Sequence, residues 1–317
     1  MFPQPSDPIA LAQVRVRAAS SRARRATRSV VLGVLLLALS GCNPAFRIAL
    51  LGDVPYSDST KPAYDRLIAD VNRDGVAFSS HVGDFKARSS ICTDAEVNEN
   101  IVRFDTFANP LVYTPGDNDW TDCSDSRTRL ARLRTLVFRS TGADSRGRST
   151  MPLTSQSDLG YPENAQWTRG PVTFATVHVV GSSDNQADPT EQSARRLADI
   201  DWVRDVFAGA KTRGDKGVVL IAHTHLRFSS AEGAKGIYES MFQAVRAETM
   251  SFAGQVLYVH GDDHTFIDDQ PMRSASNQVV TNFRRVEVYG NPTVRWVRLT
   301  VAPDTNTLFS ITTPPAP

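Results

Sequence analysis

The chain lacks any long apolar run, and it has few cysteines and almost no net charge. Its apolar stretch from Val30 to Leu39 has ten residues, which is too short to span a bilayer as a helix. The sequence therefore gives little support for a transporter or a pore. Internal repeats and a heptad pattern are also missing, which argues against a repeat array or a coiled coil.

The small net charge of +1 hides an uneven distribution. Residues 1–41 contain six arginines and one acidic residue, and the rest of the chain, with 29 basic and 33 acidic residues, carries a formal charge of −4. A mildly acidic body gives no electrostatic reason to expect nucleic-acid binding. No break in composition divides the sequence after Cys42, so we expect a single domain over residues 42–317.

The N-terminal segment has the pattern of an export signal. A basic stretch, "VRVRAASSRARRATR", precedes the apolar run, which ends in "LSGC", Leu39 to Cys42. This order resembles a bacterial lipoprotein signal peptide over residues 1–41, with a lipid on Cys42 as the mature N-terminus. The chain would then be exported and anchored to a membrane of the cell envelope, on its periplasmic or extracellular face. The alternative is an ordinary secretory signal with an incidental cysteine.

Two of the three cysteines remain if Cys42 carries a lipid. An oxidising compartment permits a disulfide between Cys92 and Cys123. Cys92 lies eight residues after Asp84, and Cys123 lies four after Asp119. A bridge would pin two loops that we expect to line the same site. The alternative is a pair of free buried thiols.

Strand and helix patterns alternate along the body of the chain, which predicts α/β layering with helices over the sheet faces. Helices are expected at 61–75, 94–107, 126–138, 188–210 and 237–252. Strands are expected at 46–53, 76–84, 110–117, 172–180, 217–223, 254–264, 278–288, 293–301 and 307–312. Residues 139–171 are rich in Ser, Thr, Gly, Arg and Pro, which indicates a long surface excursion.

Five polar clusters follow apolar strand patterns: "LGDVPY", "HVGDF", "PGDND", "IAHTH" and "HGDDH". Ligands of α/β sheets sit outside the carboxyl ends of the strands, so the polar residues there should converge on one rim. These are Asp53, Asp84, Asp117, His223 and His264. Oxygen ligands with imidazole suit Zn, Mn or Fe, and converging carboxylates repel one another unless a cation neutralises them.

The order of the clusters resembles the calcineurin-like metallophosphoesterase superfamily. Its members carry Asp-x-His, Gly-Asp-x-x, Gly-Asn-His-Asp/Glu, a lone His after a buried strand, and Gly-His-x-His, and the resemblance covers about residues 46–266. It implies an α/β (α+β) fold in which a two-sheet β-sandwich is flanked by helices. It also implies a dinuclear site that hydrolyses a phosphomonoester or phosphodiester with a metal-activated hydroxide.

The first three clusters match the family imperfectly. Asp53 corresponds to the first Asp, but Pro55 stands where the family has a His. Asp84 corresponds to the Asp that bridges the two metals. In "GDND", Asp117 stands at the metal-binding Asn and Asn118 at the His that assists the leaving group. A shift of one residue would make Asn118 the ligand instead, and both alignments stay open.

The last two clusters complete the implied ligand set. His223 corresponds to the lone His, Asp262 replaces the first His of Gly-His-x-His, and His264 retains the second. By this resemblance one metal would be held by Asp53, Asp84 and His264. The other would be held by Asp84, Asp117 or Asn118, His223 and Asp262. We expect two divalent ions, Mn, Fe or Zn, and the oxygen-rich set also admits Mg or Ca.

The catalytic candidates are Asp84, Asn118 and His225. Because Asn118 replaces the family's general acid, His225 or His260 could donate the proton to the leaving group instead. Other polar residues receive structural interpretations. His81 and His178 lie inside strand patterns, Asp119 could orient a neighbouring ligand, and Trp120 could pack the loop. Asn185 could reach the substrate cleft, although this is the less favoured interpretation.

Two functions from different classes are consistent with these residues. The first is a lipid-anchored, metal-dependent phosphoesterase acting on a small-molecule phosphate ester. The second is a non-catalytic cell-envelope lipoprotein that binds a metal or ligand at a degenerate site, as Pro55, Asn118 and Asp262 would indicate. Turnover in the presence of added metal discriminates between them.

Overall fold

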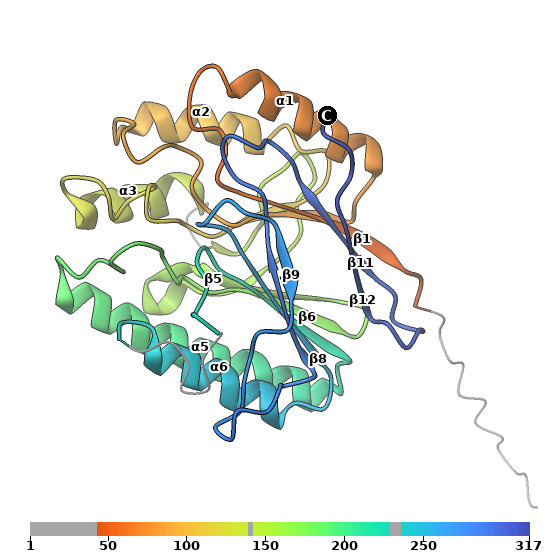
Figure 1. Ribbon diagram of the computed structural model, residues 1–317. Coiled ribbons are helices and arrows are strands. Elements are labelled where there is room, and N and C mark those ends of the chain that lie inside the picture. The colour runs from red at the N-terminus through yellow and green to blue at the C-terminus, as the bar shows by residue number, and fades with distance from the viewer. Residues whose placement is uncertain (1–42, 139–141, 229–235) are drawn as a thin grey trace, which may run out of the picture. The chain divides into compact units, whose positions relative to one another are not determined.

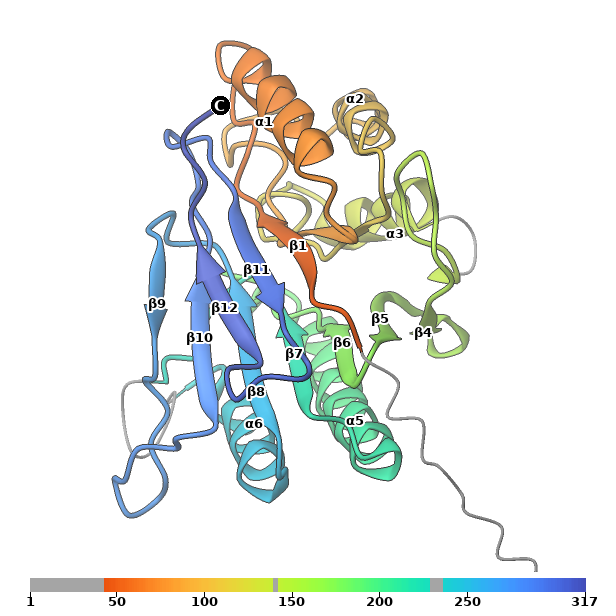
Figure 2. The same ribbon diagram turned by 90° about the vertical axis from the view of Figure 1, so that its right-hand side faces the viewer.

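A computed structural model describes residues 43–138, 142–228 and 236–317 of the chain. The predicted signal peptide, residues 1–41, and the predicted lipidation site, Cys42, lie outside the described residues. The strands that are described form two mixed sheets. Helices cover the outer face of each sheet, as Figure 1 and Figure 2 show.

The first sheet combines strands from both ends of the body of the chain. In order across the sheet they are β12 (Phe309–Thr312), β11 (Val297–Val301), β1 (Phe46–Leu51), β2 (Phe78–His81) and β3 (Leu111–Tyr113). β1, β2 and β3 run parallel, and β11 is antiparallel to β1. The helices beside this sheet are α1 (Lys61–Asp74), α2 (Asp94–Phe104) and α3 (Ser126–Val137).

The second sheet has four parallel strands at its centre. Its order is β4 (Thr154–Gln156), β5 (Tyr161–Arg169), β6 (Val172–Thr176), β7 (Gly217–Ile221), β8 (Gln255–His260), β10 (Phe283–Glu287) and β9 (Ile267–Asp269). The strands from β6 to β10 in this order are parallel, and β5 and β9 are antiparallel to their neighbours. A 3₁₀ turn, Ser157–Leu159, separates β4 from β5. Figure 2 shows β9 and β4 at opposite edges.

The core lies in three layers because alternate residues of a strand face opposite sides. Leu50 of β1 packs between the two sheets, whereas Leu51 packs under α1 to α3. In β7, Ile221 faces the space between the sheets and Leu220 faces α5 (Pro189–Arg213) and α6 (Glu239–Ser251). Figure 1 shows the two sets of helices on opposite sides of the sheets. Strands covered on both faces explain unbroken apolar runs such as "GVVLI".

Local signals in the sequence set the ends of the long helices. α5 begins where the Asp188 side chain accepts a hydrogen bond from the Glu191 backbone N–H, with Pro189 in the first turn, as its sequence predicts. α1 ends at Gly75, whose φ of 70° is a left-handed conformation that favours glycine. These elements agree with the predicted two-sheet fold flanked by helices, which is confirmed.

The expectation of a surface excursion over residues 139–171 is wrong for residues 154–169. β4 and β5 lie within it and extend the second sheet. β5 was missed because two of its four buried residues, Glu163 and Asn164, are polar. Glu163 pairs with Arg134 and His178, and Asn164 donates to Asp199 at 2.7 Å. Such a strand is stabilised by partners distant in sequence, which a hydrophobic pattern does not reveal.

The predicted disulfide is confirmed. Cys92 and Cys123 are bonded, with their Cα atoms 5.9 Å apart. The bridge ties the segment before α2 to the loop between β3 and α3. It therefore fixes two loops that follow neighbouring strands. Within the described residues, no helix has the length and hydrophobicity needed to cross a membrane.

Candidate metal centre

Polar side chains gather where the parallel strands end. Asp53, Asp84 and Asp117 follow β1, β2 and β3 of the first sheet, and His223 and His264 follow β7 and β8 of the second. The structure brings four of the five, Asp53, Asp84, Asp117 and His223, into groups of close donor atoms, and His264 lies 3.7 Å from Asp53. The site thus lies at the carboxyl ends of strands from both sheets, the usual ligand position in such folds.

His223 is the centre of the cluster. Its Nε2 lies 3.0 Å from Asp117 Oδ1, 3.6 Å from Asp84 Oδ1 and 3.7 Å from Asp262 Oδ1. Two sets of close donor atoms share it: Asp53, Asp84 and His223, and Asp117, His223 and Asp262, with the atoms of each set within 4.8 Å of one another. The other ring nitrogen, Nδ1, lies 2.9 Å from the carbonyl oxygen of Val82. A proton on Nδ1 donated to that oxygen leaves Nε2 free to bind a metal.

His264 lies at the edge of the cluster rather than within either set. Its Nε2 is 3.7 Å from Asp53 Oδ1, and its Nδ1 is 2.8 Å from the carbonyl oxygen of Asn291. The Tyr56 hydroxyl lies between His264 and Asp84: it is 3.1 Å from His264 Nε2 and donates to Asp84 Oδ2 at 3.0 Å. The hydroxyl of Tyr56 therefore occupies the side of the site that Pro55 leaves without a ligand.

Tyr56 is a site residue that the sequence analysis missed. It is the last letter of "LGDVPY", three residues after Asp53. A single aromatic residue in a turn after a strand carries no signal of its own, and the partial burial of Tyr56 appears only in the structure. The available signal was the proline itself, because the loss of a ligand at Pro55 calls for a nearby replacement.

The backbone of the site is held in unusual conformations. Asp53, Asp84, Asp262 and His264 have φ values of 55°, 58°, 76° and 63°, in the left-handed region that non-glycine residues rarely adopt. They make up four of the nine such residues in the described parts of the chain. Strained residues of this kind persist where the surrounding structure fixes them, and they concentrate at functional sites.

Two glycines allow the clusters to approach one another. A Cβ at Gly116 would lie 2.1 Å from Asp84 Oδ1, and a Cβ at Gly261 would lie 2.1 Å from Asp53 Oδ2. Both distances are far below a van der Waals contact, so each carboxylate occupies the space that a larger residue would fill. The position before the acidic residue in these motifs therefore needs glycine for its small size as well as for turn formation.

Asp119 organises two of the loops, as the sequence analysis predicted. Its carboxylate is fully buried and accepts hydrogen bonds from the backbone N–H groups of Asp84 at 2.8 Å, Phe85 at 3.1 Å and Gly116 at 2.9 Å. It also accepts one from the Tyr113 hydroxyl at 2.6 Å. These bonds lock the turn after β2 to the turn after β3, which fixes the Asp84 carboxylate relative to Asp117.

The electrostatics of the cluster are those of a cation site. Burial first, and the charge of Asp262 next, raise the pKa of Asp53 to about 8 against the opposing charge of His223. Burial also raises the pKa of Asp84. Burial acts to lower the pKa of His223, but Asp84 and Asp117 outweigh it and hold that pKa well above its usual range. The cluster holds more negative charge than its protein surroundings balance, and a divalent cation would relieve the repulsion.

The donor set therefore fits a metal. Carboxylate oxygens and imidazole nitrogens are the ligands of Mn, Fe and Zn in proteins. The two sets overlap at His223, whose Nε2 can bind one ion only, so a second ion would be held by the carboxylates. The two candidate ligands in "GDND", Asp117 and Asn118, have different partners in the structure. The Asp117 carboxylate faces His223, whereas the Asn118 side chain faces the Tyr56 hydroxyl at 3.1 Å and its backbone N–H donates to Asp84 at 3.0 Å.

The loop after β6 contributes Ser182 and not Asn185. The Ser182 hydroxyl donates to Asp117 Oδ2, and Ser182 lines the same hollow as the acidic residues. Asn185 points away: its amide donates to Glu191 at 2.7 Å, and Ser126 donates to its oxygen at 3.2 Å. The sequence analysis identified the right segment, and the structure assigns the contact to a different residue in it.

The remaining histidines lie outside the cluster. His225, a candidate proton donor, faces Asp263 at 3.4 Å, and burial lowers its pKa. His260 is fully buried with its Nδ1 2.8 Å from the Gly261 carbonyl oxygen. His81, whose pKa burial lowers to about 3, and His178 are buried structural histidines as predicted. Trp120 packs against the His178 ring at a centroid distance of 5.4 Å.

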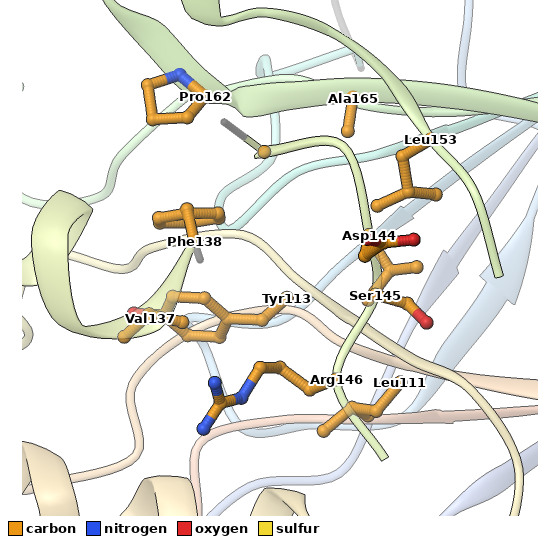
Figure 3. A pocket seen from close by; sticks show the side chains of 12 residues that line it. Leu111, Tyr113, Val137, Phe138, Asp144, Ser145, Arg146, Leu153, Pro162 and Ala165 are labelled. Atoms are coloured by element: carbon orange, nitrogen blue, oxygen red, sulfur yellow. The ribbon is translucent and has the colours of Figure 1, made fainter. Parts of the chain in front are cut away.

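A hollow of about 640 Å³ opens over the cluster, and we call it the acidic pocket. Its lining includes Asp84, Asp117, Asp262, His264, Asn118 and Arg88. This volume is within the range of small-molecule sites. A separate cavity elsewhere in the fold is much smaller, about 20 Å³, and Figure 3 shows it lined by Tyr113, Phe138, Leu153 and their neighbours. It has no candidate ligand and space for little more than one water molecule.

Comparison with known proteins gives a likeness of fold. No protein-family model matches the sequence, and no curated protein matches it significantly. Among solved structures, a dimetal phosphatase from Danio rerio superposes with a TM-score of 0.55 at 13% identity, covering 81% of this chain and 92% of that one. GAP50, the anchor in the inner membrane complex of Plasmodium, superposes with a TM-score of 0.51 at 10% identity, covering 85% and 88%.

A purple acid phosphatase from yellow lupin seeds superposes with a TM-score of 0.51 at 13% identity and covers 82% of this chain. This chain spans half the length of the lupin protein. The fold is that of the calcineurin-like metallophosphoesterases. The metallophosphoesterase fold here carries buried Asp and His groups that could hold metal ions at the strand ends. What the site does follows from its own residues, because the identities are too low to transfer an activity.

Proposed function

We propose that the protein is a metal-dependent phosphoesterase that hydrolyses a small phosphomonoester or phosphodiester. The observation that carries this proposal is the pair of Asp/His groups that share His223 at the base of an open pocket. Four candidate ligands held in left-handed backbone conformations support it, since such strain is otherwise costly. Bound metals would supply Lewis acidity and lower the pKa of a water molecule.

Each residue of the site would have its own role. The metals would be held by Asp53, Asp84, Asp117, His223 and Asp262. His264 and the Tyr56 hydroxyl would lie at the edge of the ion that Asp53 and Asp84 bind. Arg88 lines the pocket, and three quarters of its side chain is exposed. Its ion pair with Asp122 is long, at 3.4 Å. Such a loosely held guanidinium can turn to a phosphate oxygen and orient it.

The test measures metal and turnover together. Purified protein loaded with Mn, Fe or Zn is expected to retain about two metal equivalents by elemental mass spectrometry. It is also expected to release phenolate from an aryl phosphate, and chelation should abolish that release. Retained metal without hydrolysis would favour the alternative, a non-catalytic binding protein. GAP50, an anchor by its description, has the same fold.

The Tyr56 hydroxyl should matter to the metal. Tyr56→Phe removes only the oxygen that contacts Asp84 and His264, and outer groups of this kind affect metal affinity by about 10–100-fold. We expect the variant to bind metal at least about tenfold more weakly, as measured by competition with a chromogenic chelator. Tyr289→Phe is the control, because that ring stacks on Phe266, with a centroid distance of 5.2 Å, outside the acidic pocket. If Tyr56→Phe and the parent bind metal with equal affinity, the Tyr56 hydroxyl has no role in the metal site.

We further propose that the protein is exported and lipid-anchored through Cys42, on the pattern of its N-terminal sequence. The proposal is tested by mass spectrometry of the N-terminal peptide from the native host. A diacylglyceryl-modified Cys42 supports it, and an unmodified Cys42 or a start at another residue contradicts it. The envelope location also agrees with the Cys92–Cys123 disulfide, because disulfides persist in oxidising compartments.

A further inference from the structure

A second hollow of about 400 Å³ adjoins the acidic pocket, and we call it the side pocket. The two share Tyr56 and Ser89 in their linings. The side pocket contains none of the candidate metal ligands. If a phosphate group is held over the metals, its ester oxygen would lie near Tyr56 and Ser89, the residues that line both pockets. The rest of the substrate would then lie in the side pocket.

The charge of the side pocket is negative. Asp58, Glu96 and Glu99 line it together with a single basic residue, Lys61. Lys61 Nζ is committed to two of these carboxylates, at 2.8 Å from Asp58 Oδ1 and 2.8 Å from Glu99 Oε2. Arg103, outside the lining, also pairs with Glu99 at 2.9 Å. In the described parts of the chain no ion pair neutralises Glu96.

The start of α2 does not reverse this charge. Thr93 caps the helix by accepting a hydrogen bond from the Glu96 backbone N–H at 3.2 Å, and Asp94 and Glu96 lie in the first turn. Asp94 is paired with Arg129 and Arg132, so Glu96 is the carboxylate that offsets the positive end of the helix. The remaining wall contains the hydroxyl groups of Ser57, Ser90 and Thr93, which can accept hydrogen bonds from an ammonium group or a hydroxyl.

The wall is held in place relative to the metal site. Ser89, Ser90 and Thr93 belong to the segment that contains Cys92, and the disulfide joins this segment to the loop that carries Asp117 and Asn118. The distance between the phosphate position and the side pocket is thus fixed by covalent bonds. A fixed distance lets the side pocket select among leaving groups.

We propose that the side pocket binds the alcohol portion of the substrate and that this alcohol carries a positively charged amine. The inference rests on the proposed phosphoesterase function. In the reaction the oxygen of water forms a bond to phosphorus, the bond from phosphorus to the ester oxygen breaks, and the amino alcohol leaves with a proton from the water. A leaving group with a carboxylate or a second phosphate would meet the charge of Glu96 and be disfavoured.

Three phosphate esters that differ in one terminal group test this assignment. Phosphoethanolamine ends in an ammonium, hydroxyethyl phosphate in a hydroxyl and phosphoglycolate in a carboxylate. With the full-length, metal-loaded protein we expect kcat/KM to fall in that order, by about tenfold between the first and the last. Glu96→Gln is expected to reduce that ratio by about fivefold. Glu239→Gln is the matched control, because Glu239 also lies in the first turn of a helix, α6, and outside both pockets.

Calorimetric titration of the same three esters keeps the test independent of turnover. The same order of affinities, reduced by Glu96→Gln and unchanged by Glu239→Gln, supports the proposal even in a protein that does not hydrolyse them. Equal values for the three esters, or a preference that survives in Glu96→Gln, overturns it. Absence of hydrolysis of both the esters and the aryl phosphate contradicts the phosphoesterase function alone.

Discussion

Replacing Asp84 with asparagine is expected to lower kcat for an aryl phosphate by about a thousandfold or more. Asp84 is the carboxylate that contacts three other residues of the site. It lies 3.6 Å from His223, accepts from the Tyr56 hydroxyl at 3.0 Å and accepts from the Asn118 backbone N–H at 3.0 Å. Metal-ion catalysis contributes several kcal/mol to a transition state, and about 1.4 kcal/mol corresponds to a factor of ten in rate.

The substitution changes charge with little change in shape, so the fold should survive. Far-UV circular dichroism and the melting temperature check this, and metal content measured on the same sample should fall together with kcat. Asp201→Asn is the control, because Asp201 is 70% exposed and pairs only with Arg204, at 2.9 Å, on the surface of α5. An Asp84→Asn protein whose kcat stays within about tenfold of the parent would exclude Asp84 from the reaction.

The stability of the metal-free protein is expected to fall as the pH rises from about 5 to about 8. Asp53 keeps its proton up to a pKa of about 8 in the folded state, whereas an unfolded Asp loses it near 3.8. His223, with a pKa raised by its carboxylate neighbours, likewise keeps a proton that an unfolded His loses near 6.5. The folded state thus binds more protons over this window, and the free energy of unfolding decreases by about 1.4 kcal/mol per pH unit for each such proton.

The titration of Asp117 does not offset this loss of stability between about pH 5 and about pH 8. Burial acts to raise its pKa, but hydrogen bonds from His223 and Ser182 lower it to about 2, so its stabilising contribution is complete above about pH 4. Metal binding replaces the protons of the cluster. The difference in unfolding free energy between metal-loaded and metal-free protein should therefore widen from pH 5 to pH 8, by about 4 kcal/mol for each proton that the metal displaces.

Urea unfolding at several pH values, with and without chelator, measures this difference. Asp199 provides an internal control, because burial raises its pKa to about 8 as well, but it pairs with Asn164 away from the cluster. Its contribution is present with and without metal and cancels in the difference. A difference that stays constant or narrows as the pH rises would show that the cluster does not exchange protons for metal.

The candidate site could be located from the sequence because its residues follow readable strands. Asp53, Asp84, Asp117 and His223 each come directly after an apolar run, and the position of an element along the chain fixes which end of the strand carries them. For the candidate ligands the signal is local, a change from apolar to polar residues at a turn. The disulfide was predicted on another ground: the export pattern implies an oxidising compartment, and lipid on Cys42 leaves Cys92 and Cys123 as the remaining pair.

Other features depend on contacts between distant segments, and local patterns do not encode them. β5 was mistaken for surface because Glu163 and Asn164 are buried with partners on α3, on α5 and in the segment after β6. Tyr56 was missed because its role appears only when Asp84 and His264 lie beside it. Ser182 rather than Asn185 faces the pocket because left-handed conformations at Ser182, Asp184 and Asn185 turn the loop.

By itself the sequence determined most of the order of strands and helices and the strand ends at which polar groups meet, because hydrophobic periodicity and turn residues act over a few neighbours. The two-sheet architecture followed from the resemblance of the polar motifs to the metallophosphoesterases. Only the tertiary structure decided which side chains touch. It made His223 common to both donor sets, placed the Tyr56 hydroxyl where Pro55 leaves a gap, and joined the acidic pocket to a negatively charged side pocket. Those outcomes depend on packing distances of a few ångströms between segments that are far apart in the chain.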